Sequence, residues 1–451
     1  MPNRWPREDG IELTPGQKVA LEHAMTRPVT VVQGPPGTGK TFVLAEIVRN
    51  WRNIWPSKRV LVCCESNAAC DNAFEKLTAA DVPCIRVGPG AKHESNSFLK
   101  KYMEIKWEDW YYEKNKNVKM DKAKKMELLA MNDFKVVVAT TISCGNRKLN
   151  GKRFPFVICD EAAQMTLDAN LVPLRCGAKK LVLVGDHYQL PPVIHIDSLV
   201  NSYGISLFEK LAKERPDMKC LLDVQRRMHS VIAHTSNDLF YGGQILNGPN
   251  VDDKQRCPPA YARINWPEPI QGPLMFVDVH GNDVYSNKRG FSSKNWAEEE
   301  AVKKIVEYLP NTISIGIISM YKAQNSQMMK AFDHYDHVTV GTVDSFQGSE
   351  RDIIILSTVR TDSIGFLSDW RRMNVAITRA RCGLFAVGNA KLLRKDRHWK
   401  KFVDWCSDGG FMVDHNDLPK QLVAPPAPLM PDGSRFGEIP LGYKTDFRND
   451  W

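Results

Sequence analysis

Residues 31–41 read VVQGPPGTGKT, so Gly34 is followed, after four intervening residues, by Gly39, Lys40 and Thr41. An apolar run precedes this segment and a helical pattern follows it, which is the context that a phosphate-binding loop needs. Glycines let successive backbone N–H groups face phosphate oxygens, and the start of the helix adds partial positive charge. Lys40 can reach the β- and γ-phosphates, and Thr41 can join a Mg²⁺ shell. The alternative is a chance glycine-rich turn, but pattern and context favour nucleotide binding by Gly34, Pro35, Pro36, Gly37, Thr38, Gly39, Lys40 and Thr41.

A second segment, FVICDEAAQ at 156–164, ends an apolar run with two adjacent carboxylates. In open α/β sheets ligands bind at the carboxyl ends of the strands, where Asp160 and Glu161 would lie. We expect Asp160 to hold Mg²⁺ and Glu161 to orient and activate a water molecule. A solvated strand end would explain this pair on its own. Together with the loop upstream, the pair predicts hydrolysis of the nucleotide.

Short apolar runs that alternate with helical segments must position these groups. The runs are continuous rather than alternating, as expected for parallel strands that helices cover on both faces. A first series of strands is predicted over Val29–Gln33, Arg59–Cys64, Val136–Thr140, Phe156–Asp160 and Lys180–Val184. A second series, after about Ser206, is predicted over Cys220–Val224, Leu274–Asp278, Ser314–Ser319, Val338–Thr342, Ile353–Thr358 and Leu384–Val387. Helices are expected from Thr14 onward, with Pro15 in the first turn, and over Trp296–Leu309.

We therefore predict an α/β fold of two tandem domains, 11–205 and 206–413, after a leader at 1–10. Residues 88–134 are rich in Lys and aromatic residues and predict a helical insertion in the first domain. This insertion either grips a nucleic-acid strand or is a solvated helical hairpin. The proline-rich residues 414–451 predict a disordered tail, with docking to a partner's aromatic groove as the alternative.

The composition of the 451-residue chain narrows the class of protein. With 43% hydrophobic and 25% charged residues, it is not wholly disordered, collagen-like or a coiled coil. A net charge of +9 is compatible with a polyanionic partner. Eleven cysteines without paired CxxC spacing argue against a disulfide framework and a zinc ribbon, and predict reduced core thiols. No signal peptide or membrane span is expected, so we expect an intracellular protein of the cytoplasm or nucleus.

Further segments follow in order: VLVGDHYQLPP (182–192), DVQRRMH (223–229), VGTVDSFQGSERDIIILSTVR (340–360) and RRMNVAITRAR (371–381). Together with the two segments above, they make the chain resemble superfamily 1 helicases, in particular the regulator-of-nonsense-transcripts, senataxin and immunoglobulin-mu-binding helicases. The resemblance runs from about Thr14 to Phe411. It implies two RecA-like P-loop NTPase domains, with ATP and Mg²⁺ in the cleft between them and a nucleic-acid strand across the top.

The resemblance also implies roles for individual residues. Gln17 would read the adenine, Gln189 would sense the γ-phosphate, and Arg227 and Arg379 would be arginine fingers. Positions near the γ-phosphate and the ribose match Gly348 and Glu350. The strand would be contacted by Ser66, Asn67, Thr140, Thr141, Pro191, Tyr321, Gln324, Thr342 and Ser345.

One position departs from the family pattern. Family members usually carry a Tyr where this chain has Arg226, and that ring packs on the adenine. A guanidinium plane can also stack on a base, so we expect Arg226 to contribute to nucleotide binding.

The function expected from this resemblance is an ATP-dependent helicase or translocase that moves 5′ to 3′ on single-stranded RNA, or on DNA. The alternative is an ATP-gated nucleic-acid clamp, or a subunit that remodels ribonucleoprotein, with little unwinding. Either function would place a monomeric core in an RNA decay, silencing or processing assembly.

Overall fold

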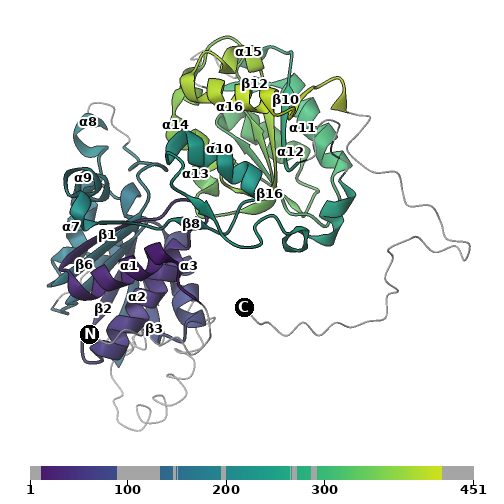
Figure 1. The fold of residues 1–451 in the computed structure, drawn as a ribbon. Helices are drawn as coiled ribbons and strands as arrows, with labels where there is room; N and C mark the ends of the chain where they lie inside the picture. The colour runs from purple at the N-terminus through teal and green to yellow at the C-terminus, as the bar shows by residue number, and fades with distance from the viewer. Residues whose placement is uncertain are drawn as a thin grey trace, which may run out of the picture.

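The structure is a computed structural model that describes residues 12–88, 133–145, 149, 151–194, 200–264, 266, 272–285 and 292–418. The predicted leader, most of the predicted insertion at 88–134 and residues 419–451 of the predicted tail lie outside the described residues. Two α/β units stand side by side, as Figure 1 shows. Each is built on a parallel sheet, which confirms the predicted fold class. None of the described helices is long and apolar enough to cross a lipid bilayer.

The first unit holds a seven-stranded sheet in the order β3-β4-β2-β5-β6-β1-β7, with all neighbours parallel. Its strands are β1 (Val29–Gln33), β2 (Val60–Cys64), β3 (Cys84–Val87), β4 (Val136–Thr140), β5 (Phe156–Asp160), β6 (Lys180–Gly185) and β7 (Lys219–Leu221). Helices α1 (Pro15–Thr26), α2 (Lys40–Ile54) and α3 (Asn67–Ala79) share a hydrophobic core with one face of the sheet. The other face packs against α6 (Thr141–Cys144), η3 (Ala162–Gln164), α7 (Leu167–Leu174) and α9 (Leu207–Glu214). Because both faces are covered, every residue of β2, β4 and β5 is buried, as the continuous apolar runs predicted.

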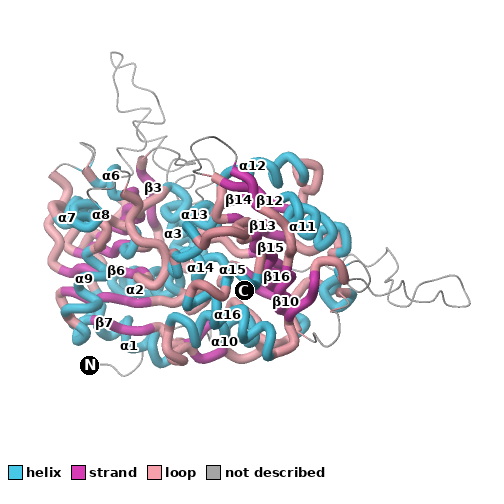
Figure 2. Tube along the Cα trace, turned by 90° about the horizontal axis from the view of Figure 1, so that it is seen from above, coloured by secondary structure: helices cyan, strands magenta, loops and turns pink. Residues whose placement is uncertain are grey.

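The second unit holds a six-stranded parallel sheet in the order β14-β13-β15-β16-β10-β17. Its strands are β10 (Leu274–Asp278), β13 (Ile315–Ser319), β14 (Val338–Gly341), β15 (Arg351–Ser357), β16 (Ala380–Gly388) and β17 (Met412–Asp414). One face packs against α11 (Trp296–Tyr308) and α12 (Lys322–Ala331). The other face packs against α10 (Ser230–Phe240), α13 (Val343–Phe346), α14 (Trp370–Ile377), α15 (Ala390–Leu393) and α16 (Arg397–Asp408). Seen from above in Figure 2, α13 and α14 lie between the two sheets.

Shorter elements connect these layers. They are α8 (Val200–Tyr203), η5 (Pro216–Met218), β8 (Val224–Gln225), β9 (Leu246–Asn247), η6 (Lys254–Arg256), η7 (Pro259–Arg263), β11 (Asp283–Tyr285), β12 (Ser293–Asn295) and η8 (Gly365–Ser368). The helix expected from Thr14 begins as predicted. Thr14 caps α1 in a capping box with Gln17, and Pro15 occupies the first turn, where its missing N–H costs nothing.

The boundary between the two units lies later in the chain than the expected position between residues 205 and 206. The strand expected over Cys220–Val224 splits into β7 and β8, and β7 pairs with β1 of the first sheet. Helix α9 also packs on that sheet, so the first unit extends to Leu222, a member of its core. The chain then crosses over, and Met228 already belongs to the core of the second unit.

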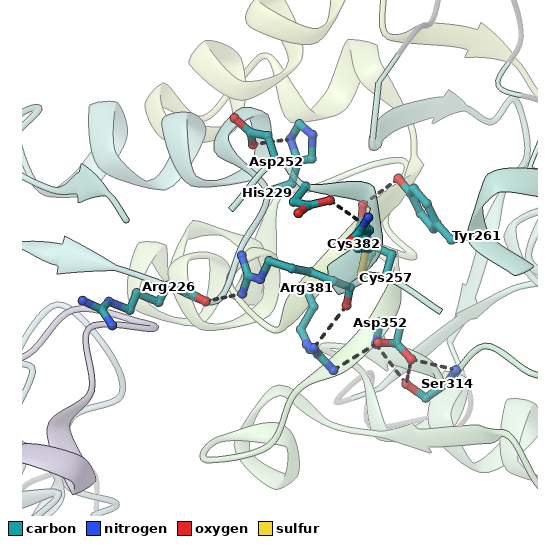
Figure 3. Close-up of a disulfide and its surroundings, with 12 residues drawn as sticks. Arg226, His229, Asp252, Cys257, Tyr261, Ser314, Asp352, Arg381 and Cys382 are labelled. Carbon is teal, nitrogen blue, oxygen red and sulfur yellow. Dashed lines mark hydrogen bonds and ion pairs between the residues drawn. A yellow bond between two sulfur atoms is a disulfide. The ribbon is translucent and has the colours of Figure 1, made fainter. Parts of the chain in front are cut away.

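Two further expectations are corrected. The tail was expected to begin at residue 414, but Asp414 lies in β17 and Leu418 is buried against the second sheet. The cysteines were expected to be reduced, and nine of them are free and buried, but Cys257 and Cys382 form a disulfide. Their Cα atoms lie 5.9 Å apart, within the range that a disulfide spans. In Figure 3 the bridge ties the η6–η7 segment to β16, where the Tyr261 hydroxyl donates to the carbonyl of Cys382 at 2.7 Å.

Candidate nucleotide-binding cleft

The loop 34–39 joins β1 to α2 and presents its backbone to the space between the two units. Gly37 and Gly39 have φ of 76° and 84°, a left-handed conformation that favours glycine. The Lys40 Nζ donates to the Gly34 carbonyl at 3.0 Å, which places the ammonium inside the loop. Behind the loop, the Gln17 Nε2 donates to the Thr38 carbonyl at 3.2 Å. Gln17 therefore braces the loop and does not line the cavity, whereas Gly37, Gly39, Lys40 and Thr41 do.

The two carboxylates lie where the end of β5 was predicted to put them. Asp160 is buried, and its Oδ1 accepts from the Glu161 N–H at 3.0 Å. Glu161 follows in a left-handed conformation with φ of 51°, which is rare for a residue with a side chain. Its Oε2 accepts from Gln164 at 3.0 Å. Such a conformation is typical of a functional site. Glu161 lines the same cavity as Lys40.

Burial of Asp160 changes the pKa of its carboxyl group. Burial and the neighbouring Glu161 raise the pKa of Asp160 to about 7, while Lys40 opposes this shift. A divalent cation beside this carboxylate would favour its charged form. The Asp160 carboxylate and the Thr41 hydroxyl are oxygen donors of the kind that Mg²⁺ prefers, so the residues present fit the expected cation.

A cavity of about 460 Å³ brings residues of both units and of the crossover segment together. It is lined by Pro35, Gly37, Gly39, Lys40, Thr41, Phe42, Asn72, Lys76, Glu161, Gln189, Arg226, Arg227, Gly348, Glu350 and Arg379. Most of these residues were predicted, and both expected arginine fingers lie among them. Phe42, Asn72 and Lys76 were missed. Phe42 adjoins the loop in sequence, but nothing in the residue types or spacing of Asn72 and Lys76 distinguishes them from solvated residues of a helix.

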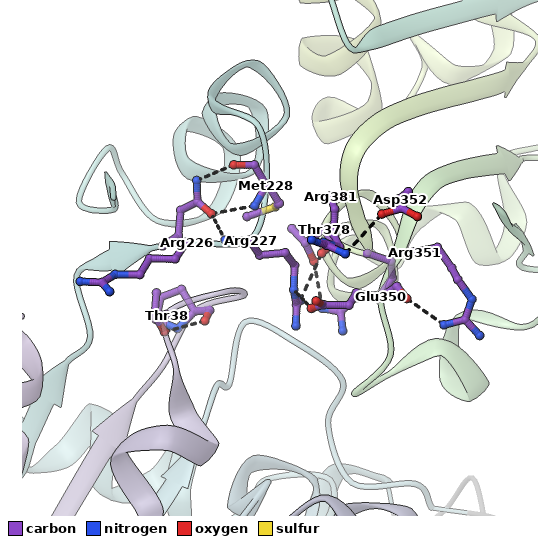
Figure 4. A network of polar contacts seen from close by, with 12 residues as sticks. Thr38, Arg226, Arg227, Met228, Glu350, Arg351, Asp352, Thr378 and Arg381 are labelled. Atoms are coloured by element: carbon purple, nitrogen blue, oxygen red, sulfur yellow. Dashed lines mark hydrogen bonds and ion pairs between the residues drawn. The ribbon is translucent and has the colours of Figure 1, made fainter. Parts of the chain in front are cut away.

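Arg227 approaches the loop from the crossover between the units. A Cβ at Gly37 would lie 2.6 Å from the Arg227 Cβ, and the Arg226 N–H donates to the Gly37 carbonyl at 2.9 Å. Glycine at 37 is therefore needed for this close approach as well as for its φ. In Figure 4 the Arg227 side chain points to Glu350, with which it forms an ion pair. Burial alone would raise the pKa of Glu350, but the charge of Arg227 holds this pKa below its ordinary value.

Arg379 is the more deeply buried arginine, with 2% of its surface exposed. Its Nε donates to the Val375 carbonyl at 2.9 Å, and its Nη2 lies 3.4 Å from Gln189 Oε1. Burial, and then the charge of Arg227, lower the pKa of Arg379 to about 9. Arg227 and Arg379 repel each other beside the phosphate-binding loop, so an anion bound between them would stabilise both charges.

Comparisons with known proteins show to which family the chain belongs. Models of the AAA domain match residues 203–391 and residues 12–134 and 106–197. The regulator of nonsense transcripts 1 homolog of Drosophila melanogaster is 32% identical over 91% of this chain and 37% of its own length. The ATP-dependent helicase upf1 of Schizosaccharomyces pombe is 33% identical over 98% of this chain and 54% of its own length. The chain belongs to the regulator-of-nonsense-transcripts type of superfamily 1 helicases.

The chain spans only part of these relatives, between about a third and about a half of their own length. The DNA polymerase alpha-associated DNA helicase A of Schizosaccharomyces pombe is 29% identical over 89% of this chain and 67% of its own length. Relatives named for transcripts and for DNA are thus both similar to this chain.

The residues expected to contact a strand in this helicase family fall into three groups. Ser66 of the first unit and Ser345 of the second are exposed and line the same cavity, of about 670 Å³. Thr342 caps α13 beside Ser345, and Asn67, also exposed, accepts from Arg86 at 2.8 Å.

A second group lies deeper in the structure. Thr140 caps α6 and Thr141 is its first residue, with 8% and 3% of their surfaces exposed. Thr141 donates to Glu65 at 3.2 Å. Pro191 lines another interdomain cavity, of about 410 Å³, together with Arg371 and Arg372.

The remaining two residues are not brought to this surface. Gln324 is fully buried, and its amide is committed to the backbone of Asn295, accepting at 2.9 Å and donating at 3.2 Å. Tyr321 is 3% exposed and packs against Phe366, with ring centroids 6.0 Å apart. Gln324 thus holds β12 against α12, a role that sequence alone did not reveal.

Proposed function

We propose that this chain is an ATP-dependent motor that translocates 5′ to 3′ along single-stranded RNA. The observation that carries the proposal is the arrangement of Arg227 and Arg379 around the cavity of the phosphate-binding loop. An arginine donated across a cleft to a leaving γ-phosphoryl group adds about 10³–10⁵ in rate. It also ties closure of the two units to the state of the nucleotide, as a stepping motor requires.

In the proposed cycle, Lys40 and the loop N–H groups bind the triphosphate, and Thr41 and Asp160 would hold Mg²⁺. The cation would neutralise phosphate charge. Glu161 accepts a proton from the attacking water, while Arg227 and Arg379 stabilise the charge on the departing phosphoryl group. Loss of that group removes the anion between the two cations, which weakens the closed arrangement and releases the grip of Ser66 and Ser345 on the strand.

RNA is proposed as the strand because the Drosophila melanogaster relative is named as a regulator of nonsense transcripts. A place in an RNA decay assembly is proposed on the same ground. The relative named as a DNA helicase makes DNA the comparison that any assay needs.

Steady-state ATPase measured with single-stranded RNA and single-stranded DNA in parallel, at fixed salt, tests the proposal. We expect stimulation by RNA, no turnover by Lys40→Ala, and binding without turnover by Glu161→Gln. Full activity of either variant would refute the assignment of the site. A strand-displacement assay then separates the motor from the alternative, because a clamp hydrolyses ATP and releases no strand.

A further inference from the structure

The loop 186–189, which follows β6 and ends at Gln189, docks against α14 of the second unit. Three successive loop residues are contacted from α14 and the residues just after it. The Arg371 Nε donates to the His187 carbonyl at 3.0 Å, and the Asn374 Nδ2 donates to the Tyr188 carbonyl at 2.7 Å. The third contact is the one between Arg379 and Gln189. Positions 371 and 374 lie one turn apart on one helical face, so α14 runs along the loop.

A buried hydrogen-bonded chain connects the same two segments a second time. The Gln189 Nε2 and the Tyr241 hydroxyl donate to the same oxygen, Asp186 Oδ2, at 2.8 and 2.7 Å. The Tyr241 oxygen accepts from Asn374 at 2.8 Å. Asn374 is fixed in turn, because Ser236 donates to its Oδ1 at 2.9 Å. At most 6% of the surface of any of these side chains is exposed.

The chain of bonds therefore runs from Asn374 through Tyr241 and Asp186 to Gln189, and returns to α14 through Arg379. Asp186 and Gln189 belong to the first unit, whereas Asn374, Tyr241 and Arg379 belong to the second. Burial and the Asp186 carboxylate raise the pKa of Tyr241, so its hydroxyl keeps the proton that it donates. Separation of the units would break the Tyr241 bond to Asp186 and the Asn374 bond to Tyr188 together with the Arg379 contact.

We propose that Tyr241 and Asn374 are positioning residues that hold Gln189 and seat Arg379 only when the two units are closed. They touch no nucleotide; they act by making the orientation of Gln189 depend on the docking of α14. The inference rests on the proposed function, since it assigns these residues a part in coupling closure to hydrolysis. Loss of one bond to a buried carboxylate corresponds to a loss of about 10- to 100-fold in rate.

The test is Tyr241→Phe, which removes one oxygen and keeps the ring. We expect kcat for RNA-stimulated ATP hydrolysis to fall at least about 10-fold, with the KM for Mg-ATP within about 2-fold of wild type. The matched control is Tyr261→Phe, which removes a hydroxyl that also donates at 2.7 Å in the second unit but to the Cys382 carbonyl, away from the cleft. The control should keep wild-type kcat and KM. The melting temperature of each variant shows that the comparison is made between folded proteins, and Ser236→Ala, which loosens Asn374, provides a second route to the same loss.

A double variant makes the assignment specific. If Tyr241 acts through Gln189, then Tyr241→Phe adds little to the defect of Gln189→Ala, whereas independent residues multiply their effects. A wild-type protein without ATPase activity would overturn the proposed function itself. An active wild type together with unchanged kcat in Tyr241→Phe, or with multiplied defects in the double variant, would overturn this inference alone.

Discussion

Replacement of Arg379 by Gln separates the catalytic use of this side chain from its contribution to stability. Burial, and then the charge of Arg227, lower the pKa of Arg379 to about 9, which corresponds to a penalty on the charged form on the order of 5 kcal/mol. Glu161 and Glu350 oppose this shift, and the remaining penalty destabilises the folded protein as long as no phosphate lies beside the guanidinium. Arg379→Gln removes it, so the melting temperature should stay the same or rise.

The rate should move in the opposite direction. A guanidinium that stabilises the leaving phosphoryl group contributes about 10³-fold or more, or roughly 4 kcal/mol of transition-state stabilisation. We therefore expect kcat to fall about 10³-fold while the affinity for Mg-ATP, which depends mainly on the loop 34–39, changes little. Single-turnover hydrolysis and equilibrium nucleotide binding measure the two quantities separately.

The control for this experiment is Arg381→Gln. Arg381 lies two residues further along and pairs with Asp352 at 3.3 Å, and it does not line the nucleotide cavity. It should retain wild-type kcat. The reasoning fails if Arg379→Gln keeps more than about a tenth of the wild-type rate, because an arginine finger contributes far more than that.

Two further predictions concern base contact and pH. Arg226 lines the cavity beside the loop, and stacking of its guanidinium on the base is worth about 1 kcal/mol. Arg226→Ala should therefore raise the KM for ATP about 5-fold, and Arg226→Tyr should restore the wild-type KM. An unchanged KM in Arg226→Ala would show that Arg226 does not touch the base. Glu298 is fully buried and accepts from Ser357 and Val359, and burial raises its pKa to about 8 against these hydrogen bonds. Since the folded state holds this proton more tightly than the unfolded chain, the stability contributed by the neutral form is present below about pH 4.5 and is lost as pH rises toward 8. Denaturant unfolding at pH 5 and pH 8.5 should show a smaller loss of unfolding free energy for Glu298→Gln than for wild type, and identical losses would contradict the assignment.

Much of the fold follows from the sequence because buried parallel strands must be continuously apolar. The runs that became β1, β4, β5 and β10 were predicted with their observed bounds. The short strand β7 was misplaced because its three residues carry no sign of which sheet they join. Its membership shows only in the fold, where β7 pairs with β1 and helix α9 packs on the same sheet. The disulfide was also invisible, since its two cysteines are 125 residues apart in sequence and only the fold brings them together.

The site divides in a similar way. The loop 34–41 and the Asp160–Glu161 pair follow from residue type and spacing, because their chemistry is local. Arg227 and Arg379 could be assigned only by resemblance, since an isolated arginine in sequence does not reveal what it faces. The sequence did not reveal that Gln324 is buried. Its amide forms hydrogen bonds with the backbone of Asn295, so it does not reach the surface at which it was expected to contact nucleic acid.

The central claim is that the cleft is completed from both sides, and a structure with a transition-state mimic tests it most directly. The protein would be crystallised with Mg²⁺, ADP, aluminium fluoride and a short single-stranded RNA. We expect the guanidinium groups of both Arg227 and Arg379 to lie within about 3.2 Å of the fluoride ligands, at hydrogen-bond distance. A complex in which nucleotide fills the loop 34–39 while both guanidinium groups point away from the fluorides would contradict the account.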